Sequence, residues 1–172
     1  FSLQIGDANI LAAETGIPVV ADFRRKDMAL GGQGAPLVPA FHRYAFASTH
    51  ANRVIVNIGG ISNISLVASN GDCIGFDTGP GNLIMDLWSQ THIGTHYDHN
   101  GDWAASGEPY PPLLQQMKGC EFFTKPAPKS TGRELFNHSW LNTQLAEFAN
   151  LEPQDIQATL LSLTAETICE AI

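Results

Sequence analysis

Three short apolar runs, separated by two glycine-containing turns, most constrain the fold of this chain. The runs are Val54–Ile58, Ile61–Val67 and Cys73–Phe76, and the turns are Gly59-Gly60 and Asn70-Gly71. Paired glycines and Asn-Gly dipeptides are typical of tight hairpin turns, because they adopt positive φ angles at little cost. We therefore predict two successive β-hairpins over this stretch.

The third run leads into a loop that is dense in turn residues, Asp77-Thr78-Gly79-Pro80-Gly81-Asn82. An apolar-periodic helix follows from Leu83, with Asn82 at the position of its N-cap. Glycine and proline fix the backbone here, so the carboxylate of Asp77 is a candidate general base held in one geometry. The alternative is that Asp77 only caps the turn, since aspartate is common at such positions.

The Asp-Thr-Gly triplet also suggests an aspartic peptidase. That class needs a second carboxylate to share a proton. The chain has no second Asp-Thr-Gly, and Pro80 follows the glycine where a small residue is expected. A serine hydrolase would need a GxSxG elbow, which is absent. We favour neither class.

The first hairpin, from Asn57 to Asn63, is a candidate phosphate site. Neither GxxxxGK[ST] nor GxGxxG is present. A tight turn between two strands can instead present backbone N–H groups and small polar side chains to a nucleotide phosphate. Plain turn chemistry is the alternative, because glycine pairs are common in hairpins. The candidate residues are Asn57, Gly59, Gly60, Ser62 and Asn63.

The pattern of residues 1–23 predicts a strand, a helix and a second strand. Residues Phe1–Ile5 alternate like a strand, Asp7 caps a helix that runs to about Thr15 and ends at Gly16, and Val19–Phe23 reads as a buried strand. This order of elements, with short connections, favours an α/β fold over a β-sandwich.

A charged cluster follows the second predicted strand. Open α/β sheets bind ligands at the carboxyl ends of their strands. Arg24 or Arg25 could therefore pair with an anionic substrate group, while Asp22 or Gln33 could bind sugar hydroxyls. A solvated cluster of charges is the alternative. The glycine-rich loop Gly31-Gly32-Gln33-Gly34 comes next.

The remaining chain is mostly helical. We predict a helix from Pro39 to about Phe46 and a linker over Ala47–Asn52. Residues 91–131 read as loops with short helices, and a longer helix covers about residues 140–149. The last helix begins at Pro153, with an apolar stripe formed by Ile156, Leu160, Leu163 and Ile168.

The composition argues against nucleic-acid and membrane partners. Nine basic and 17 acidic residues give a net charge of −8, and no basic run could follow a phosphate backbone or an anionic membrane. No apolar run approaches the ~20 residues that cross a bilayer. Three widely spaced cysteines favour a reducing compartment over a disulfide scaffold. We expect a soluble, cytoplasmic protein without nucleic-acid or membrane partners.

Two further features are the spacing of three histidines, which bears on metal binding, and the positions of the two chain ends. His92, His96 and His99 have spacings that a helix would place on one face, but Gly94 disfavours a continuous helix, and we assign no metal site. The chain opens on Phe1 inside a predicted strand and closes on Ile172 inside a predicted helix. We therefore expect a fragment of a longer protein.

Six segments, taken in order, resemble the anhydro-N-acetylmuramic acid kinase family nearly from end to end. The segments are Val19-Val20-Ala21-Asp22-Phe23-Arg24, Gly31-Gly32-Gln33-Gly34-Ala35-Pro36-Leu37-Val38-Pro39, Asn57-Ile58-Gly59-Gly60-Ile61-Ser62-Asn63, Gly75-Phe76-Asp77-Thr78-Gly79-Pro80-Gly81-Asn82, Trp103-Ala104-Ala105-Ser106-Gly107 and Lys129-Ser130-Thr131-Gly132-Arg133-Glu134.

The resemblance implies an α/β, actin-like and ribonuclease H-like fold with two lobes around a cleft. It implies that residues 1–50 end the first lobe and that residues 51–172 begin the second. It also implies a kinase that uses ATP and Mg²⁺ to open 1,6-anhydro-N-acetylmuramic acid with water and to phosphorylate O6, yielding N-acetylmuramic acid 6-phosphate for cell-wall recycling.

The resemblance also implies roles for individual residues, wherever a family motif matches this sequence. Asp77 matches the catalytic base, and the segment from Asn57 to Asn63 matches a phosphate-side hairpin. The substrate side of the cleft is matched by Asp22, Arg24, Gly32, Gln33 and Gly34. Because Asn57 stands where many relatives carry aspartate, we assign no metal ligand there.

Two departures from the family pattern remain. The N-terminal Ser-Gly-Thr-Ser-type ATP loop and the C-terminal glycine-rich adenosine segment are absent from these 172 residues. We therefore expect the fragment alone to be inactive. Another hexosamine kinase of the superfamily, or a non-catalytic sugar-binding fragment, is the alternative reading, and a homodimer is left open.

Overall fold

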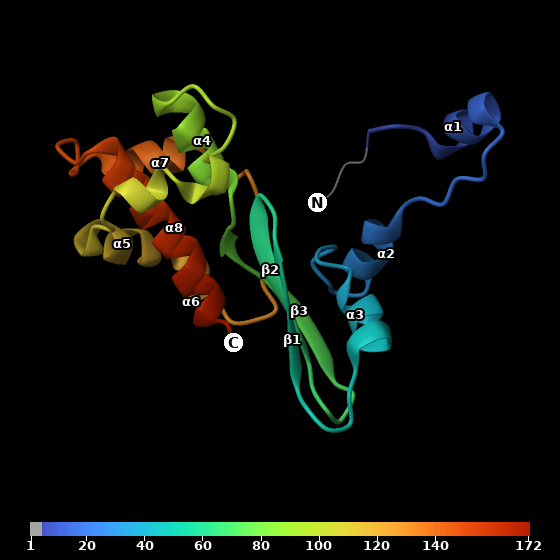
Figure 1. The fold of residues 1–172 in the computed structure, drawn as a ribbon. Coiled ribbons are helices and arrows are strands. Elements are labelled where there is room, and N and C mark those ends of the chain that lie inside the picture. The colour runs from blue at the N-terminus through green and yellow to red at the C-terminus, as the bar shows by residue number, and fades with distance from the viewer. Residues whose placement is uncertain (1–4) are drawn as a thin grey trace.

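The structure is a computed structural model that describes residues 5–172. The strand predicted for Phe1–Ile5 lies almost entirely outside the described residues. A three-stranded sheet stands between two groups of helices (Figure 1). The helices within residues 8–46 lie on one side of the sheet, and the helices within residues 83–169 lie on the other. The predicted mixed α/β class is confirmed, with a small antiparallel sheet.

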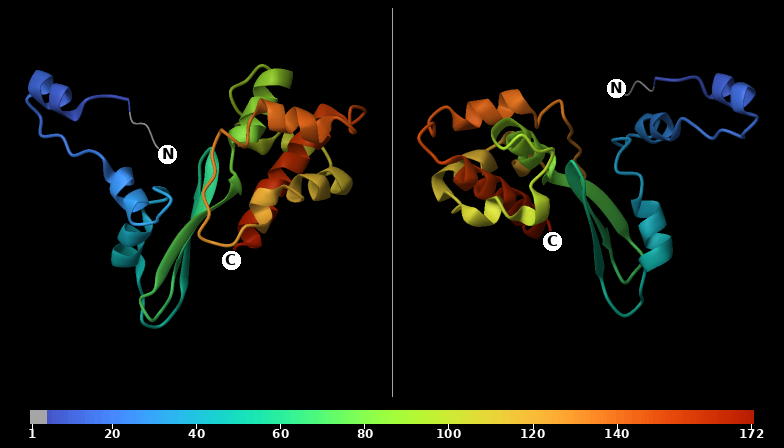
Figure 2. Two further views of the ribbon diagram at one scale, coloured as in Figure 1. Left: turned by 180° about the vertical axis from the view of Figure 1, so that it is seen from behind. Right: turned by 45° about the horizontal axis from the view of Figure 1, so that its top comes forward.

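The sheet consists of β1 (Arg53–Ile58), β2 (Ile61–Val67) and β3 (Cys73–Pro80) in the order β1-β2-β3, with both pairings antiparallel. Both predicted hairpins are confirmed. A register shift at Ser62/Asn63 leaves Thr78 without a cross-strand partner, so β3 carries a bulge next to Asp77. Figure 2 shows this long, twisted ribbon from two further sides.

The helices after the sheet enclose the hydrophobic core. Their bounds are α4 (Leu83–His92), α5 (Pro111–Lys118), α6 (Glu121–Thr124), α7 (His138–Leu145) and α8 (Pro153–Cys169), with 3₁₀ turns at His99–Gly101 and Ala104–Ser106. The apolar stripe predicted for the last helix is confirmed: Ile156, Leu160, Leu163 and Ile168 are all buried. Leu163 and Phe136 are fully enclosed in this core.

The N-terminal helices are α1 (Ala8–Thr15), α2 (Phe23–Ala29) and α3 (Pro39–Phe46). The first matches its prediction. The Asp7 carboxylate accepts hydrogen bonds from the Asn9 and Ile10 amides at 2.7 and 3.3 Å, and Gly16 ends the helix with φ of 66°. The helix from Pro39 is also confirmed, and the segment Ala47–Asn52 that follows it forms no helix or strand.

The strand predicted at Val19–Phe23 is wrong. This stretch is irregular until Phe23 begins α2, and Val20 is 78% exposed. A strand needs a neighbour to pair its N–H and C=O groups, and no strand among residues 5–172 lies beside this segment. Apolar composition alone therefore does not make it a strand.

No helix among residues 5–172 has both the length and the apolar character needed to cross a membrane.

Candidate active site

Three polar side chains lie in a row across the sheet, one on each strand. Asn57 on β1 is paired with Asn63 on β2, which is paired in turn with Asp77 on β3. Directly paired residues place their side chains on the same face, with Cβ atoms roughly 5 Å apart. The register thus brings the predicted base beside two residues of the predicted phosphate hairpin.

The polar row faces the side of the sheet that carries α3. Ser65 lies two residues beyond Asn63 on the same face of β2, and its hydroxyl is 2.8 Å from Nδ1 of His42 on α3. Pro39, at the start of α3, packs so closely on this face that a Cβ at Gly75 would lie 2.3 Å from it. Helix α3 therefore covers the sheet next to the row.

Asp77 is 5% exposed and is held by the segment from Lys129 to Thr131. Its Oδ2 accepts hydrogen bonds from the Ser130 hydroxyl and the Thr131 amide, both at 2.9 Å. Its own amide donates to the Lys129 carbonyl at 2.9 Å. Burial raises the pKa of Asp77, the bonds from Thr131 and Ser130 oppose that rise, and the nearby charge of Glu134 adds to it. A carboxylate with a raised pKa is a better proton acceptor near neutral pH.

The loop after β3 is fixed by two glycines. Gly79 has φ of 146°, and a Cβ there would lie 2.7 Å from the Phe123 ring. A Cβ on Gly81 would lie 2.1 Å from the Gly59 carbonyl oxygen. The loop is therefore pressed against the tip of the first hairpin, and only glycine fits there.

The same contact determines which groups of the hairpin tip are available. The Gly60 carbonyl accepts the Gly81 amide at 2.9 Å, and the Gly59 carbonyl accepts the Asn82 amide at 2.8 Å. Among residues 5–172, the N–H groups of Gly59 and Gly60 make no such backbone bond. Donors without a protein acceptor suit an anionic group such as phosphate.

Ser62 differs from the other predicted hairpin residues. Its side chain is fully buried on the opposite face of the sheet, where Oγ lies 2.6 Å from Oγ1 of Thr78 and donates to the Gly79 carbonyl at 3.2 Å. Its hydroxyl therefore stabilises the bulge in β3 and does not lie on the Asp77 face.

The predicted substrate residues form a separate group around α2. Both oxygens of Asp22 contact Arg25, at 2.6 Å to Nε and 2.6 Å to Nη2. Arg24 Nε donates to the Gly34 carbonyl at 2.9 Å, and Asp27 Oδ2 accepts the Gly34 amide at 2.7 Å. The charged cluster thus holds the glycine loop against α2.

The other two predicted substrate positions complete that loop. At Gly32 a Cβ would lie 2.1 Å from the Asp27 carboxylate, so the Asp27 side chain would have to move, while Gln33 is exposed. Within residues 5–172, no hydrogen bond or ion pair links the loop to Asp77. The structure therefore does not bring the predicted substrate residues together with the polar row.

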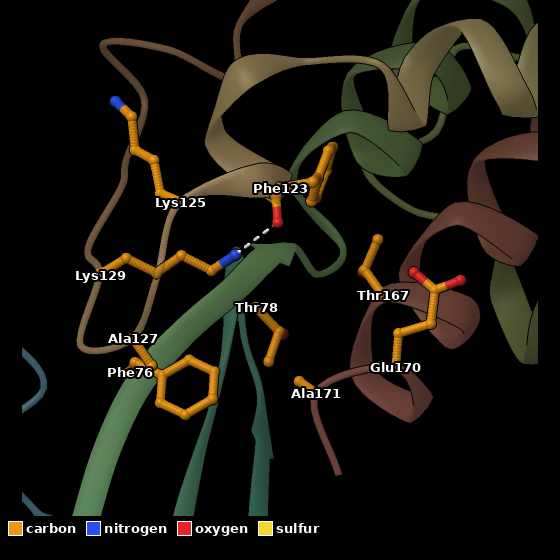
Figure 3. Close-up of a pocket in the computed structure, with 9 residues that line it drawn as sticks. All are labelled: Phe76, Thr78, Phe123, Lys125, Ala127, Lys129, Thr167, Glu170 and Ala171. Atoms are coloured by element: carbon orange, nitrogen blue, oxygen red, sulfur yellow. Dashed lines mark hydrogen bonds between the residues drawn. The ribbon is translucent and has the colours of Figure 1, made fainter.

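A pocket of about 260 Å³ lies behind β3, between the segment that precedes Lys129 and the end of α8 (Figure 3). Phe76 and Thr78 point into it together with Thr167 and Glu170. Because side chains alternate along a strand, Asp77 points to the other face. This pocket is thus separate from the polar row.

The three histidines do not share a helix face. Helix α4 ends at His92, whose ring packs on Trp88 with centroids 3.7 Å apart. His96 and His99 follow in exposed loop and turn. No cluster of three or more His, Cys, Asp and Glu side chains that could hold a metal ion occurs in the described part of the chain.

Sequence reasoning assigned no role to Ser130 or Thr131. Both belong to the segment that resembles the kinase family, but they contact Asp77 from 53 and 54 positions away. No local pattern marks such a contact. The resemblance of this segment was the only signal that it mattered.

Comparisons with known proteins agree on the family. A family profile described as anhydro-N-acetylmuramic acid kinase matches residues 1–172. Proteins named anhydro-N-acetylmuramic acid kinase are 56% identical over 172 residues in Pasteurella multocida, 56% over 172 in Aliivibrio fischeri and 57% over 173 in Shewanella oneidensis. Each match includes the whole chain, which spans 46–47% of the length of these relatives. This chain therefore belongs to the anhydro-N-acetylmuramic acid kinase family.

Proposed function

We propose that this chain supplies the general base and one phosphate-binding hairpin of an ATP-dependent kinase. The enzyme would open 1,6-anhydro-N-acetylmuramic acid with water and phosphorylate O6, giving N-acetylmuramic acid 6-phosphate. The family match supports the reaction class. The observation that carries the assignment within this chain is the carboxylate of Asp77, which is buried, fixed through one oxygen and raised in pKa.

In the proposed reaction, Asp77 accepts a proton from a water molecule. The water oxygen then bonds to C1 of the sugar as the bond between C1 and O6 breaks. O6 takes the γ-phosphoryl group of ATP, and ADP leaves. A buried aspartate suits the first step, because burial raises its pKa and so makes it a better proton acceptor near neutral pH.

The hairpin tip fits the phosphate end of a nucleotide. The N–H groups of Gly59 and Gly60 are the available donors, and Asn57 and Asn63 lie near this tip in the same row as Asp77. ATP supplies the phosphoryl group when bound. A Mg²⁺ ion in such a kinase would be held largely by the nucleotide phosphates, since Mg²⁺ needs only one or two protein carboxylates beside them.

We also infer that residues 1–50 belong to one lobe of a two-lobed, actin-like kinase and residues 51–172 to the other. The irregular segment Ala47–Asn52, between α3 and β1, supports a boundary there. The substrate residues around α2 would then face Asp77 across the cleft between the lobes.

The test is to run the full-length protein in ¹⁸O-labelled water with the 1,6-anhydro sugar and ATP. We expect one label at the anomeric oxygen of the early product, none in the phosphoryl group, and no ATP consumption with N-acetylglucosamine. Label in phosphate would refute water attack at C1. Turnover of N-acetylglucosamine would instead indicate an ordinary hexosamine kinase.

The pH profile gives a second check. Burial raises the pKa of Asp77 above the ordinary value of 3.8. The base form is therefore lost, as pH falls, at a higher pH than for an exposed aspartate. We expect kcat/KM to decline on the acid side with an apparent pKa above 3.8. An acid limb at or below that value would contradict a buried base.

A further inference from the structure

The segment from Lys129 to Thr131 runs along the outer edge of β3. Strand β3 pairs with β2 on its other edge, and on this edge the Asp77 amide donates to the Lys129 carbonyl at 2.9 Å. One short segment thus contacts both the backbone and the side chain of Asp77. The proposed reaction steps involve Asp77 but no residue of this segment.

The two oxygens of the Asp77 carboxylate have different surroundings. Oδ2 accepts the Ser130 hydroxyl and the Thr131 amide, both at 2.9 Å. Oδ1 accepts no hydrogen bond from residues 5–172, and it is not among the side-chain oxygens sealed from solvent without a partner. Two donors therefore fix one oxygen and leave the other facing outward.

The segment is itself anchored by Lys129. The ammonium group donates to the carbonyls of Phe122 and Phe123 at the end of α6, at 3.1 and 2.9 Å (Figure 3 shows the second bond). It also lies 4.8 Å from the centroid of the Phe122 ring. These contacts join the segment to the core, so the position of Ser130 does not depend on a flexible loop.

We propose that Ser130 is a positioning residue for the kinase reaction. Together with the Thr131 amide, its hydroxyl holds Oδ2 of Asp77 and turns Oδ1 toward the face where water and sugar bind. This inference rests on the proposed function, since it takes Asp77 to be the base. It assigns Oδ1, and not Oδ2, as the atom that receives the proton.

The charged and titratable groups around the carboxylate are few. Glu134 acts on it through its negative charge. Lys129 directs its ammonium group to the α6 carbonyls. On the face that α3 covers, His42 contacts Ser65, and the charge of Arg43 acts on Cys73. The Ser130 hydroxyl, which donates to Asp77, is neutral. Its removal therefore deletes a hydrogen bond to Asp77 without changing the local charge.

The test compares Ser130→Ala and Ser130→Thr in the full-length protein. A hydrogen bond to a charged group favours the charged form, so its loss raises the pKa of Asp77. For Ser130→Ala we expect kcat to fall about 10-fold, with little change in the KM of the sugar. The acid limb of kcat/KM is expected to move up by about one pH unit. Ser130→Thr, which keeps the hydroxyl, should restore most of both.

A matched control is Ser106→Ala. The Ser106 hydroxyl also donates one hydrogen bond, to the Trp103 carbonyl at 2.7 Å, but in an exposed turn. We expect its kcat and pH profile to equal those of the unmodified protein. Unchanged kcat and acid limb in Ser130→Ala would overturn the proposal. Loss of activity with an unmoved acid limb, or without rescue by threonine, would also overturn it, because a purely structural role has that signature.

A direct titration separates this proposal from the function on which it rests. Protein carrying ¹³C-labelled aspartate, with the Asp77 signal assigned from Asp77→Asn, reports the carboxyl pKa without any turnover. A raised pKa in Ser130→Ala, beside an Asp77→Asn variant that remains fully active, would overturn the base assignment and with it the catalytic role of Ser130. A raised pKa with an inactive Asp77→Asn variant is the expected outcome.

Discussion

The two halves of this chain differ sharply in how their helices are stabilised. None of the residues in α1, α2 and α3 is buried, whereas α8 alone buries nine. Tyr44 on α3 is 89% exposed, while Leu163 on α8 is 0% exposed. Both regions contain apolar residues at helical spacing, so composition does not explain the difference.

The comparison shows that the local signals that set the ends of a helix are separate from the tertiary packing that stabilises it. Helix α1 has a complete set of end signals, with Asp7 at its start and Gly16 at its end. Isolated helices of eight residues are marginal in water, however, and most helix stability comes from burial of an apolar face. Helix α3 is intermediate, because Pro39 and His42 contact the sheet while its outer residues stay exposed.

The largest expected effect tests where the chemistry lies. Asp77→Asn in the full-length protein keeps the shape of the side chain but removes its ability to accept a proton. General-base catalysis contributes about 10²–10⁴-fold, so kcat should fall by that factor, about 3–5 kcal/mol in barrier, with little change in KM. Steady-state kinetics with the anhydro sugar, beside a recorded melting temperature, measure this.

The matched variant in the other region is Asp22→Asn. Asp22 pairs with Arg25 on the surface and belongs to the predicted substrate side, so its loss should affect KM more than kcat. If Asp22→Asn abolished kcat while Asp77→Asn left it intact, the base would lie in the N-terminal region and the comparison would be reversed.

The next effect concerns stability. Phe136→Ala removes a fully buried ring from the core and should cost about 3–5 kcal/mol of unfolding free energy. Tyr44→Ala removes a ring of similar size from the exposed face of α3 and should change it by less than about 0.5 kcal/mol. Urea unfolding of both variants provides the values. Equal losses would show that the N-terminal helices are buried in solution.

A smaller effect is expected at the tip of the first hairpin. Gly81→Ala would force a Cβ against the Gly59 carbonyl and separate the loop from the hairpin, which we expect to cost about 1–3 kcal/mol. At Gly60 a Cβ would make only ordinary contact, with Leu83 at 3.8 Å, so Gly60→Ala is the control. Thermal unfolding compares the two, and equal stability would refute the close approach.

The smallest effect is local. Asp7→Ala removes the N-cap of α1, so hydrogen exchange of the α1 amides should become faster by about five-fold. The amides of α8 should exchange at an unchanged rate, because the core and the residues packed on it include none from α1 within residues 5–172. Slower exchange throughout the chain would show that α1 is coupled to the packed region.

The sequence predicted the parts of this fold that depend on neighbouring residues. Asp7 and Gly16 marked both ends of α1, and Pro153 marked the start of α8. Gly59-Gly60 marked the turn between β1 and β2. The prediction failed at Val19–Phe23, because a strand depends on a partner that no local pattern contains. At Asn82 the position of the cap was right, but its side chain donates to Asp86 and makes no capping bond.

The sequence by itself determined the family, the identity of the candidate base and the hairpin beside it, because short sequence motifs identify each of these features. Only the tertiary structure decided that Asn57, Asn63 and Asp77 form one row, since strand register fixes which residues face each other. It likewise decided that Ser62 is buried and that Ser130 binds Asp77 across 53 positions. A contact between residues far apart in the sequence depends on how helices and strands pack together. Local patterns in a single sequence do not reveal that packing.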